Sequence, residues 1–399
     1  MLTHDTRRSR LSAWAANRLR ARNAVSGRFF PEQAHRFADV SRQMAARFLR
    51  GGRLIAFGRG PYATDAQHVA VEFVHPVIVG KRALPALDLS GAYRTWVAAV
   101  LRPEDIALGF GPPEGDADVL DVLAAAAARG ALAVALPGRG GDYAFESPAP
   151  GDPFIHQEMF EVAYHTLWET VHVFLEHQTL GHTVGAAGFL YPFLGVEPPD
   201  MHALAEDVAS SIVTKAQDDE GLRERIARDE ADRIAGAILA VRERLHAGGK
   251  LVLFGNGGSA TDANDWAIDC VAPPAGYRPI PAVSLSMEPA VLTAIANDVG
   301  RDVMFLRQLI AQAGPEDVAV GLSTSGGSEN VNLALEEART RGLLTLAVLG
   351  CDGGETLRRG LADFAFVVRS DYIPRIQEAQ ASLYHLLREG LEVSPPEHA

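Results

Sequence analysis

The chain has 399 residues, which is too long for one ordinary domain and suits two or three. Its hydrophobic content of 47% and charged content of 22% fit a globular protein, and its formal net charge of -13 excludes nucleic acid and anionic membranes as partners. No stretch reaches the roughly 18 apolar residues of a membrane span. The two cysteines, Cys270 and Cys351, argue against a disulfide framework and fit a reducing cytosol, so we expect a soluble cytoplasmic protein.

The N-terminal arm is the one basic segment of this acidic chain. Residues 12–20 lack the apolar run of an export signal, so we interpret the arm as a solvated helix face. Its basic residues are Arg7, Arg8, Arg10, Arg18, Arg20 and Arg22.

Three segments of the first half recur in the same order in the second half. The offsets between the copies are 197, 212 and 220 residues, so the second copy has gained short insertions between shared elements. An ordered set of matches indicates a duplication. The matched pairs are residues 51–66 with 248–263, 103–130 with 315–342, and 155–165 with 375–385.

In chain order, each copy reads as a helix, a short buried strand, and then alternating helices and strands. This alternation predicts an α/β fold in each copy, a parallel sheet flanked by helices in a flavodoxin-like three-layer sandwich. We expect one domain at 1–180, a linker rich in Gly and Pro at 181–200, and a second domain at 201–399. The expected helices are 31–50 and 201–247, and the clearest expected strands are 53–57, 250–254, 317–322 and 343–350.

Two loops of the second copy are suited to binding a phosphate group. Residues 255–265 form a Gly-rich turn that opens a helix, where backbone amides point toward an anion. Residues 322–331 offer four hydroxyl groups at another helix start, and the alternative is that these hydroxyls only cap the helix. The hydroxyl residues are Ser323, Thr324, Ser325 and Ser328.

The corresponding loops of the first copy, 58–68 and 109–118, lack this hydroxyl cluster. Prolines replace donors there, and the carboxylates of Glu114 and Asp116 would repel a phosphate. We therefore expect the first copy to bind no phosphate in this way.

At these loops the chain resembles the phosphoheptose isomerase family of SIS-domain proteins. The resemblance implies two tandem SIS domains that interconvert a ketose phosphate and an aldose phosphate, typically sedoheptulose 7-phosphate. Because family members are tetramers of one-domain subunits, it also implies a homodimer of this duplicated chain. The matching segments are GNGGSATDA (255–263), PAVSLS (281–286), ANDVG (296–300), LSTSGGSENV (322–331) and PRIQEAQ (374–380) with His385.

The resemblance also implies site residues. A His, a Glu, a Gln and a second His bind zinc in several members, and the Glu and the later His form an acid–base pair. The implied metal ligands are His68, Glu72, Gln157 and His165, and the second-copy positions are Asp265, Asp269, Gln377 and His385. The implied catalytic residues are Glu72, His165, Asp269 and His385, and the implied substrate-binding residues are Asn256, Gly257, Gly258, Ser259, Asp298, Ser323, Thr324, Ser325, Ser328 and Gln377. Asp298 either binds sugar hydroxyls or shapes a loop.

Spacing gives an independent view of the metal ligands. His68 and Glu72 are four residues apart on one helix face and can hold one ion, although such pairs are also common on solvated faces. Gln157 and His165 lie about 12 Å apart along a helix, so we infer sharing across an interface. The first copy keeps the ligands and the second keeps the phosphate loops. Our hypothesis is an active site completed between the halves, and the alternative is a decayed, structural first copy.

The sequence thus favours an aldose–ketose isomerase that acts on a seven- or eight-carbon sugar phosphate through an enediol, with Asp269 as base and His385 as its partner. Three positions depart from the family, with Pro76 and Pro273 in place of its Arg and Met287 in place of its Asp. These departures keep open the alternative of a non-catalytic sugar-phosphate sensor or partner-binding scaffold.

Overall fold

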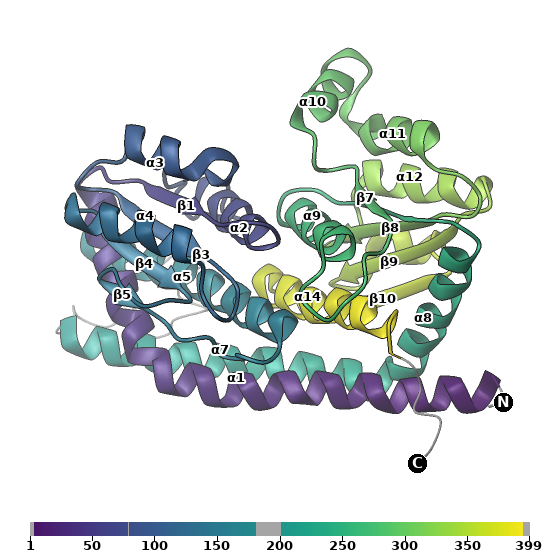
Figure 1. Ribbon diagram of the computed structural model, residues 1–399, viewed down its shortest axis with the longest axis horizontal. Coiled ribbons are helices and arrows are strands. Elements are labelled where there is room, and N and C mark those ends of the chain that lie inside the picture. Colours follow the sequence, from purple (N-terminus) through teal and green to yellow (C-terminus); the bar gives the residue numbers. More distant parts are fainter. Residues whose placement is uncertain (1–3, 79, 181–200, 394–399) are drawn as a thin grey trace. The chain divides into compact units, whose positions relative to one another are not determined.

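The computed structural model describes residues 4–78, 80–180 and 201–393, and these fall into two compact units (Figure 1). We call Ala24–Asp218 the first-copy unit, and Met1–Asn23 with Asp219–Ala399 the second-copy unit. Helices α1 (His4–Leu49) and α7 (Met201–Asp229) each contribute residues to both units, which the expected division at 1–180 and 201–399 did not include. The expected linker, 181–200, lies outside the described residues.

The first-copy unit is built on a five-stranded parallel sheet in the order β2-β1-β3-β4-β5. Its central strands are buried on both faces, as their continuous apolar sequences require. The expected strand at 53–57 is confirmed as β1. The strands are β1 (Leu54–Phe57), β2 (Ala86–Asp88), β3 (Ile106–Phe110), β4 (Leu132–Leu136) and β5 (Tyr143–Ala144).

Helices cover both faces of this sheet. Ile55 and Phe57, alternate residues of β1, pack in one apolar cluster with residues of α3 and α4. On the other face α2 contacts β1, and α5 packs against α2. The helices are α2 (Tyr62–Val74), α3 (Tyr93–Val100), α4 (Ala117–Ala128) and α5 (Pro153–Leu180).

The second-copy unit repeats this topology, with a parallel sheet in the order β7-β6-β8-β9-β10. Strand by strand this is the order of the first-copy unit, which confirms the duplication and the α/β prediction. The strands expected at 250–254, 317–322 and 343–350 are all present. The strands are β6 (Leu251–Phe254), β7 (Ala282–Ser284), β8 (Val318–Ser323), β9 (Leu344–Gly350) and β10 (Phe364–Val368).

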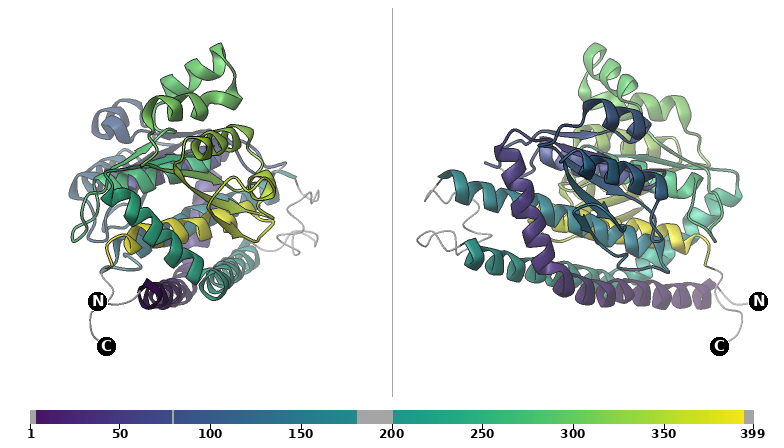
Figure 2. Two further views of the ribbon diagram at one scale, coloured as in Figure 1. Left: turned by 90° about the vertical axis from the view of Figure 1, so that its right-hand side faces the viewer. Right: turned by 60° about the vertical axis from the view of Figure 1, so that its left-hand side comes forward.

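Alternate side chains of β6 face two helical layers. Leu251 and Leu253 share a core with α8, α9 and α14, whereas Val252 and Phe254 share one with α11 and α12. Helices thus lie on both faces of this sheet (Figure 2). The pair α10 and α11 stands where the first-copy unit has only α3 as an α-helix, which explains the growth in repeat offset from 197 to 212 residues. The helices are α8 (Ala231–His246), α9 (Gly258–Val271), α10 (Pro289–Asp298), α11 (Met304–Gln312), α12 (Glu329–Thr340), α13 (Gly354–Arg358) and α14 (Ile373–Gly390). None of the described helices is long and apolar enough to cross a membrane.

The N-terminal arm corrects the sequence interpretation of a solvated helix face. It is amphipathic, because Leu11, Ala15 and Leu19 are buried at four-residue intervals in the core of the second-copy unit. Arg22 is fully buried, and its Nη2 lies 3.0 Å from Oε2 of Glu389 on α14. The sequence interpretation missed this apolar stripe, because its three residues stand among many arginines.

We predict that Glu389→Ala lowers the urea midpoint of unfolding and costs about 3 kcal/mol, because it removes a buried carboxylate that pairs with both Arg22 and Arg18. Asp232→Ala is the matched control, since Asp232 pairs with Arg8 on the same helix but is exposed. Equal midpoints for the two variants in denaturation monitored by circular dichroism would contradict the assignment.

Candidate active site

The loop between β6 and α9 is shaped by glycine. Gly257, at the N-cap of α9, has a φ of 57°, a conformation that side chains disfavour. Gly258 begins the helix, and Ser259 is buried in its first turn. The loop therefore presents the start of α9 at the carboxyl end of a parallel strand, where open α/β sheets bind ligands.

The loop between β8 and α12 holds the predicted hydroxyl cluster. Ser323 Oγ accepts a hydrogen bond from the Gly326 amide at 3.1 Å and lies 3.3 Å from Ser328 Oγ. Ser325 Oγ accepts from the Gly327 amide at 3.2 Å, and the side chain of Thr324 is partly exposed. The cluster is thus a folded turn rather than an extended segment.

Two features favour an anion site over simple helix capping. Ser328 occupies the N-cap of α12, yet its side chain makes no capping hydrogen bond. The amides of Asn256 and Asn330 donate to each other's Oδ1, both at 2.9 Å, and so join the two loops. The helix starts of α9 and α12 are therefore held together with hydroxyl groups between them, an arrangement that suits phosphate oxygens.

In the first-copy unit, charged side chains of the protein itself occupy the corresponding helix start, that of α4. Asp116, the N-cap of α4, accepts hydrogen bonds from the amides of Asp118 at 2.9 Å and Val119 at 3.2 Å. Arg59 Nη1 lies 3.3 Å from Oδ2 of Asp116 and 2.9 Å from Oδ2 of Asp118. A carboxylate that already satisfies a helix start competes with phosphate there, which agrees with the sequence expectation.

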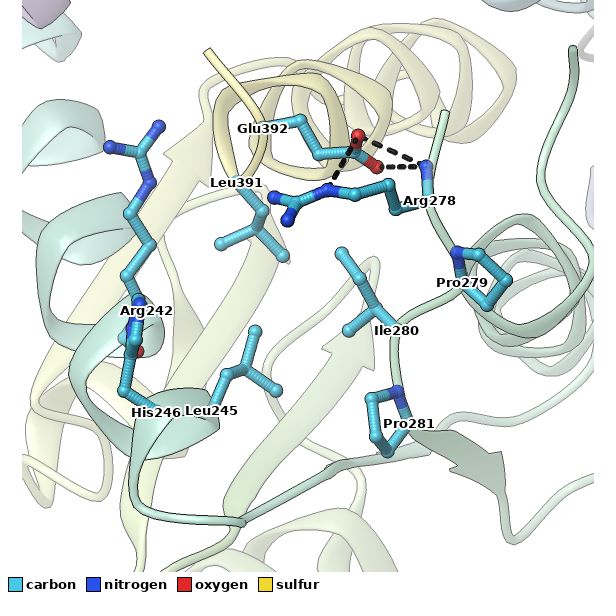
Figure 3. A pocket seen from close by; sticks show the side chains of 9 residues that line it. All are labelled: Arg242, Leu245, His246, Arg278, Pro279, Ile280, Pro281, Leu391 and Glu392. Atoms are coloured by element: carbon cyan, nitrogen blue, oxygen red, sulfur yellow. Dashed lines mark hydrogen bonds and ion pairs between the residues drawn. The ribbon is translucent and has the colours of Figure 1, made fainter. Parts of the chain in front are cut away.

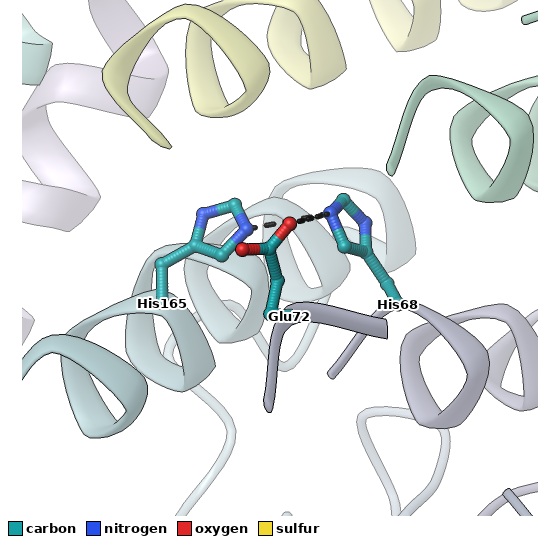
Figure 4. Close-up of side chains that lie close together, drawn as sticks. All are labelled: His68, Glu72 and His165. Carbon is teal, nitrogen blue, oxygen red and sulfur yellow. Dashed lines mark hydrogen bonds and ion pairs between the residues drawn. The ribbon is translucent and has the colours of Figure 1, made fainter. Parts of the chain in front are cut away.

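Three of the four implied metal ligands converge inside the first-copy unit. His165 from α5 points at His68 and Glu72 from α2, and the Nε2 atoms of the two histidines are 3.4 Å apart (Figure 4). His68 Nε2 lies 3.8 Å from Glu72 Oε1. All three side chains are buried, and their donor atoms lie within 4.8 Å of one another. This compact, buried donor set is the arrangement that a metal ion requires.

The fourth implied ligand, Gln157, makes a different contact. Its Nε2 donates to Oδ2 of Asp65 at 3.2 Å, two turns along α5 from His165. Helices α2 and α5 pack together, so Gln157 and His165, which are two turns apart on α5, contact different turns of α2. His165 therefore reaches His68 and Glu72 within one unit, and the spacing argument for sharing does not apply to this trio.

A second buried trio lies between α9 and α14 of the second-copy unit. His385 Nε2 is 3.2 Å from Oδ2 of Asp265 and 3.1 Å from Oδ2 of Asp269. The hydroxyl of Tyr384 donates to the same Oδ2 of Asp265 at 2.7 Å. Burial, and then the neighbouring charge of Asp265, raises the pKa of Asp269 to about 6, while its contact with His385 acts in the opposite direction.

A buried carboxyl with a pKa near 6, in contact with an imidazole, is equipped to take up and return a proton near neutral pH. Arg388 fixes the geometry by donating from Nε to the backbone oxygen of Asp269 at 3.0 Å, which ties α14 to the last turn of α9. The donor atoms of this trio also lie within 4.8 Å of one another. Its hydrogen bonding to Tyr384 favours proton chemistry.

The remaining predicted residues lie elsewhere in the second-copy unit. Gln377 is buried on α14, two turns before His385. Asp298 is exposed at the end of α10, accepts a hydrogen bond from Asn297 Nδ2 at 2.8 Å, and lines a cavity of about 490 Å³ over α10 and α11. Its role in substrate binding stays a prediction.

A smaller pocket of about 220 Å³ lies between the ends of α8 and α14 and the segment before β7 (Figure 3). Arg278 and Glu392 form an ion pair on its wall, and Leu245, Ile280 and Leu391 line it. None of the predicted site residues lines this pocket.

Sequence reasoning missed two residues of the site. Asn330 lies within the second predicted phosphate loop, but its position in the sequence does not predict its hydrogen bonding with Asn256. Tyr384 precedes His385, and the only available signal was that Tyr164 likewise precedes His165 in the other copy.

Comparison with known families agrees with this geometry. The SIS domain family model matches residues 216–350, so the chain is an SIS-domain protein. It is 42% identical over 182 residues to the phosphoheptose isomerase of Pelobacter propionicus, covering 95% of that protein and 45% of this chain. The corresponding enzyme of Geobacter sulfurreducens is 42% identical over 170 residues, with coverage of 89% and 42%. The chain therefore belongs to the phosphoheptose isomerase family, which places it among the sugar-phosphate isomerases.

Two solved structures are similar to parts or most of this chain. The phosphoheptose isomerase of Neisseria gonorrhoeae is 30% identical and matches 47% of this chain and 98% of its own, with a TM-score of 0.43. The C-terminal domain of glucosamine-fructose-6-phosphate aminotransferase from Francisella tularensis matches 92% of this chain and 93% of its own, at 10% identity and a TM-score of 0.57. The latter likeness, which spans nearly the whole chain, concerns the fold alone and agrees with two tandem α/β domains.

We predict that the raised pKa of Asp269 makes the protein lose stability as pH rises. The protonated carboxyl is tolerated in the folded state, so the stability is complete below the unfolded pKa near 4 and is lost as pH rises through about 6. Each pKa unit of difference is worth about 1.4 kcal/mol. Urea unfolding between pH 4 and pH 7 should therefore show a shallower decline in Asp269→Asn than in the wild type. Parallel pH profiles of the two proteins would contradict the raised pKa.

Proposed function

We propose that the second-copy unit interconverts a ketose phosphate and an aldose phosphate of seven or eight carbons through an enediol. The observation that carries this proposal is that α9 begins at the glycine loop, which the Asn256–Asn330 pair joins to the hydroxyl-bearing loop, and bears Asp269, in contact with His385, further along. Phosphate binding and proton transfer are thus attached to one rigid element. The names of the related enzymes, phosphoheptose isomerases, support a heptose phosphate.

The reaction moves a proton between C1 and C2 of the sugar. Asp269, ionised above about pH 6, accepts the proton from carbon, and His385 donates through Nε2 to the carbonyl oxygen that becomes a hydroxyl. Asp269 then returns its proton to the neighbouring carbon, while the hydroxyl on the first carbon gives its proton to Nε2 of His385 and becomes the new carbonyl, so both groups end in their starting states. Phosphate held at the two helix starts supplies the binding energy that keeps the reacting carbons in place.

The length of α9 supports a long substrate. Asp265 and Asp269 follow Gly258 by seven and eleven residues, or about 10 and 16 Å along the axis, and their side chains tilt back toward the helix start. At roughly 1.2 Å per bond, phosphorus and C2 are about 8 Å apart in an extended seven-carbon sugar phosphate, and only about 4 Å apart in a three-carbon one. A triose phosphate is therefore too short to reach from the loop to the carboxyl pair.

We predict that purified protein incubated with sedoheptulose 7-phosphate in deuterated water incorporates deuterium at C2 of the aldose phosphate. Asp269→Asn should slow this exchange by roughly 10²–10⁴-fold, because it removes the base, and should leave sugar-phosphate affinity nearly unchanged. The exposed Asp352 in the same unit gives the control, Asp352→Asn, which should exchange at the wild-type rate.

Octulose 8-phosphate is the second substrate to try in the same NMR assay. Saturable binding of either sugar by the wild type with no exchange would reject the isomerase and favour a sugar-phosphate sensor or a scaffold. The sensor or scaffold alternative is supported by Asp265, which stands where the family has a His.

The trio of His68, Glu72 and His165 fits a zinc ion, and we propose it as a zinc site. Ligands bonded at about 2.0–2.2 Å in a tetrahedron lie about 3.4 Å apart, close to the 3.4 and 3.8 Å separations found here. Two imidazole nitrogens and one carboxylate oxygen are a common donor set for zinc. A bound zinc would supply Lewis acidity and would link α2 to α5.

Metal analysis of purified protein tests this site without reference to activity. Mass spectrometry of the metal content should find about one zinc per chain in the wild type, and Glu72→Gln should lose most of it because the amide is a weaker ligand. Glu176→Gln, a carboxyl on α5 that pairs with Lys81, should retain the metal. Equal zinc content in the two variants would refute the assignment.

We also propose that the chain acts in the cytoplasm as a homodimer. Both cysteines are free thiols, Cys270 buried and Cys351 partly exposed, as expected for a reducing compartment. The duplicated chain offers two SIS units, so two chains would supply the four units of the related tetramer.

A further inference from the structure

His385 faces two carboxylates with a single proton on Nε2. The Oδ2 atoms of Asp265 and Asp269 lie at nearly equal distances, 3.2 and 3.1 Å, and both side chains are buried. Two buried carboxyls this close to one imidazole compete for the proton, because the charge of each disfavours ionisation of the other. Distance alone does not decide which carboxyl carries the permanent charge.

Tyr384 breaks this symmetry. Its hydroxyl donates to Oδ2 of Asp265 at 2.7 Å, and a hydrogen bond to the charged form of a carboxyl favours ionisation. The ring is held in place, because it stacks on Trp266 of α9 with centroids 5.7 Å apart and meets the His385 ring edge-on at 4.4 Å. The hydroxyl is therefore aimed at one of the two carboxyls by packing on both helices.

We propose that Tyr384 is a positioning residue that fixes Asp265 as the permanent anion and so leaves Asp269 as the carboxyl that exchanges a proton with the substrate. This inference rests on the proposed isomerase function. It also accounts for Asp265, which stands where the first-copy unit has His68, as a charged partner that holds His385 protonated on Nε2.

The surroundings of Asp269 agree with this assignment. Asp265 faces it from its own helix, and His385 and Arg388 face it from α14. Burial and the charge of Asp265 raise the pKa of Asp269 to about 6, as expected if Asp265 stays ionised beside it.

The test is Tyr384→Phe, which removes the hydroxyl and keeps the ring. Carboxyl ¹³C NMR of protein labelled at aspartate, with signals assigned through Asp265→Asn and Asp269→Asn, should show Asp269 titrating near pH 6 in the wild type. In Tyr384→Phe the titration of Asp269 should move below pH 6, because the hydroxyl no longer favours the competing carboxylate. The matched control is Tyr164→Phe, the corresponding tyrosine of the first-copy unit, which should leave the Asp269 titration unchanged.

Kinetics supply the second readout. Tyr384→Phe should lower kcat for deuterium exchange about tenfold or more with KM within about twofold, since the hydroxyl acts on the proton-transfer pair and not on the phosphate. An unchanged Asp269 titration in Tyr384→Phe would overturn the inference, even if activity fell. Absence of exchange in the wild type would reject the isomerase, whereas the NMR titration would still decide the role of Tyr384.

Discussion

The packing of the first helix after the leading strand against the helix that follows the last strand of the sheet is the contact on which each site depends. In the second-copy unit α9 lies against α14, and this brings His385 to Asp265 across 120 residues of sequence. In the first-copy unit α2 lies against α5 and brings His165 to His68. Both contacts are buried, so the ionisable groups meet where water screens them little, and burial raises the pKa of Asp269 there.

One backbone topology therefore carries two different buried clusters of ionisable groups, and the differences are in a few side chains. A histidine and a glutamate on α2 give a compact donor set for a metal, whereas Asp265 and Asp269 at the same helix positions give a carboxyl pair around one imidazole. The helix starts diverge in the same way. Asp116 caps α4 with its own carboxylate, while Ser328 leaves the start of α12 to hydroxyls and amides. Internal charge in one copy replaces the external anion expected in the other.

How much of the site could be predicted depends on how local its determinants are. The phosphate loops were predictable, because glycine and hydroxyl residues at a strand-to-helix turn act through their own backbone. For the trio of His68, Glu72 and His165, spacing predicted only the pair of His68 and Glu72. Spacing along one helix does not say which residue of a distant helix will contact that pair. The burial of Arg22 and the roles of Tyr384 and Asn330 were not predicted, because each depends on a partner far away in sequence.

The sequence by itself determined the duplication, the alternation of strands and helices and the asymmetry between the two sets of loops. Local patterns of apolar, glycine and hydroxyl residues determine these features, because such residues affect the conformation of only a few neighbouring positions. Only the tertiary structure decided that Gln157 meets Asp65 rather than joining the histidines, and that Asp269 rather than an exposed carboxyl has its pKa raised. Those outcomes depend on helix packing and burial between segments more than ninety residues apart. The spacing of residues within either segment does not predict these contacts.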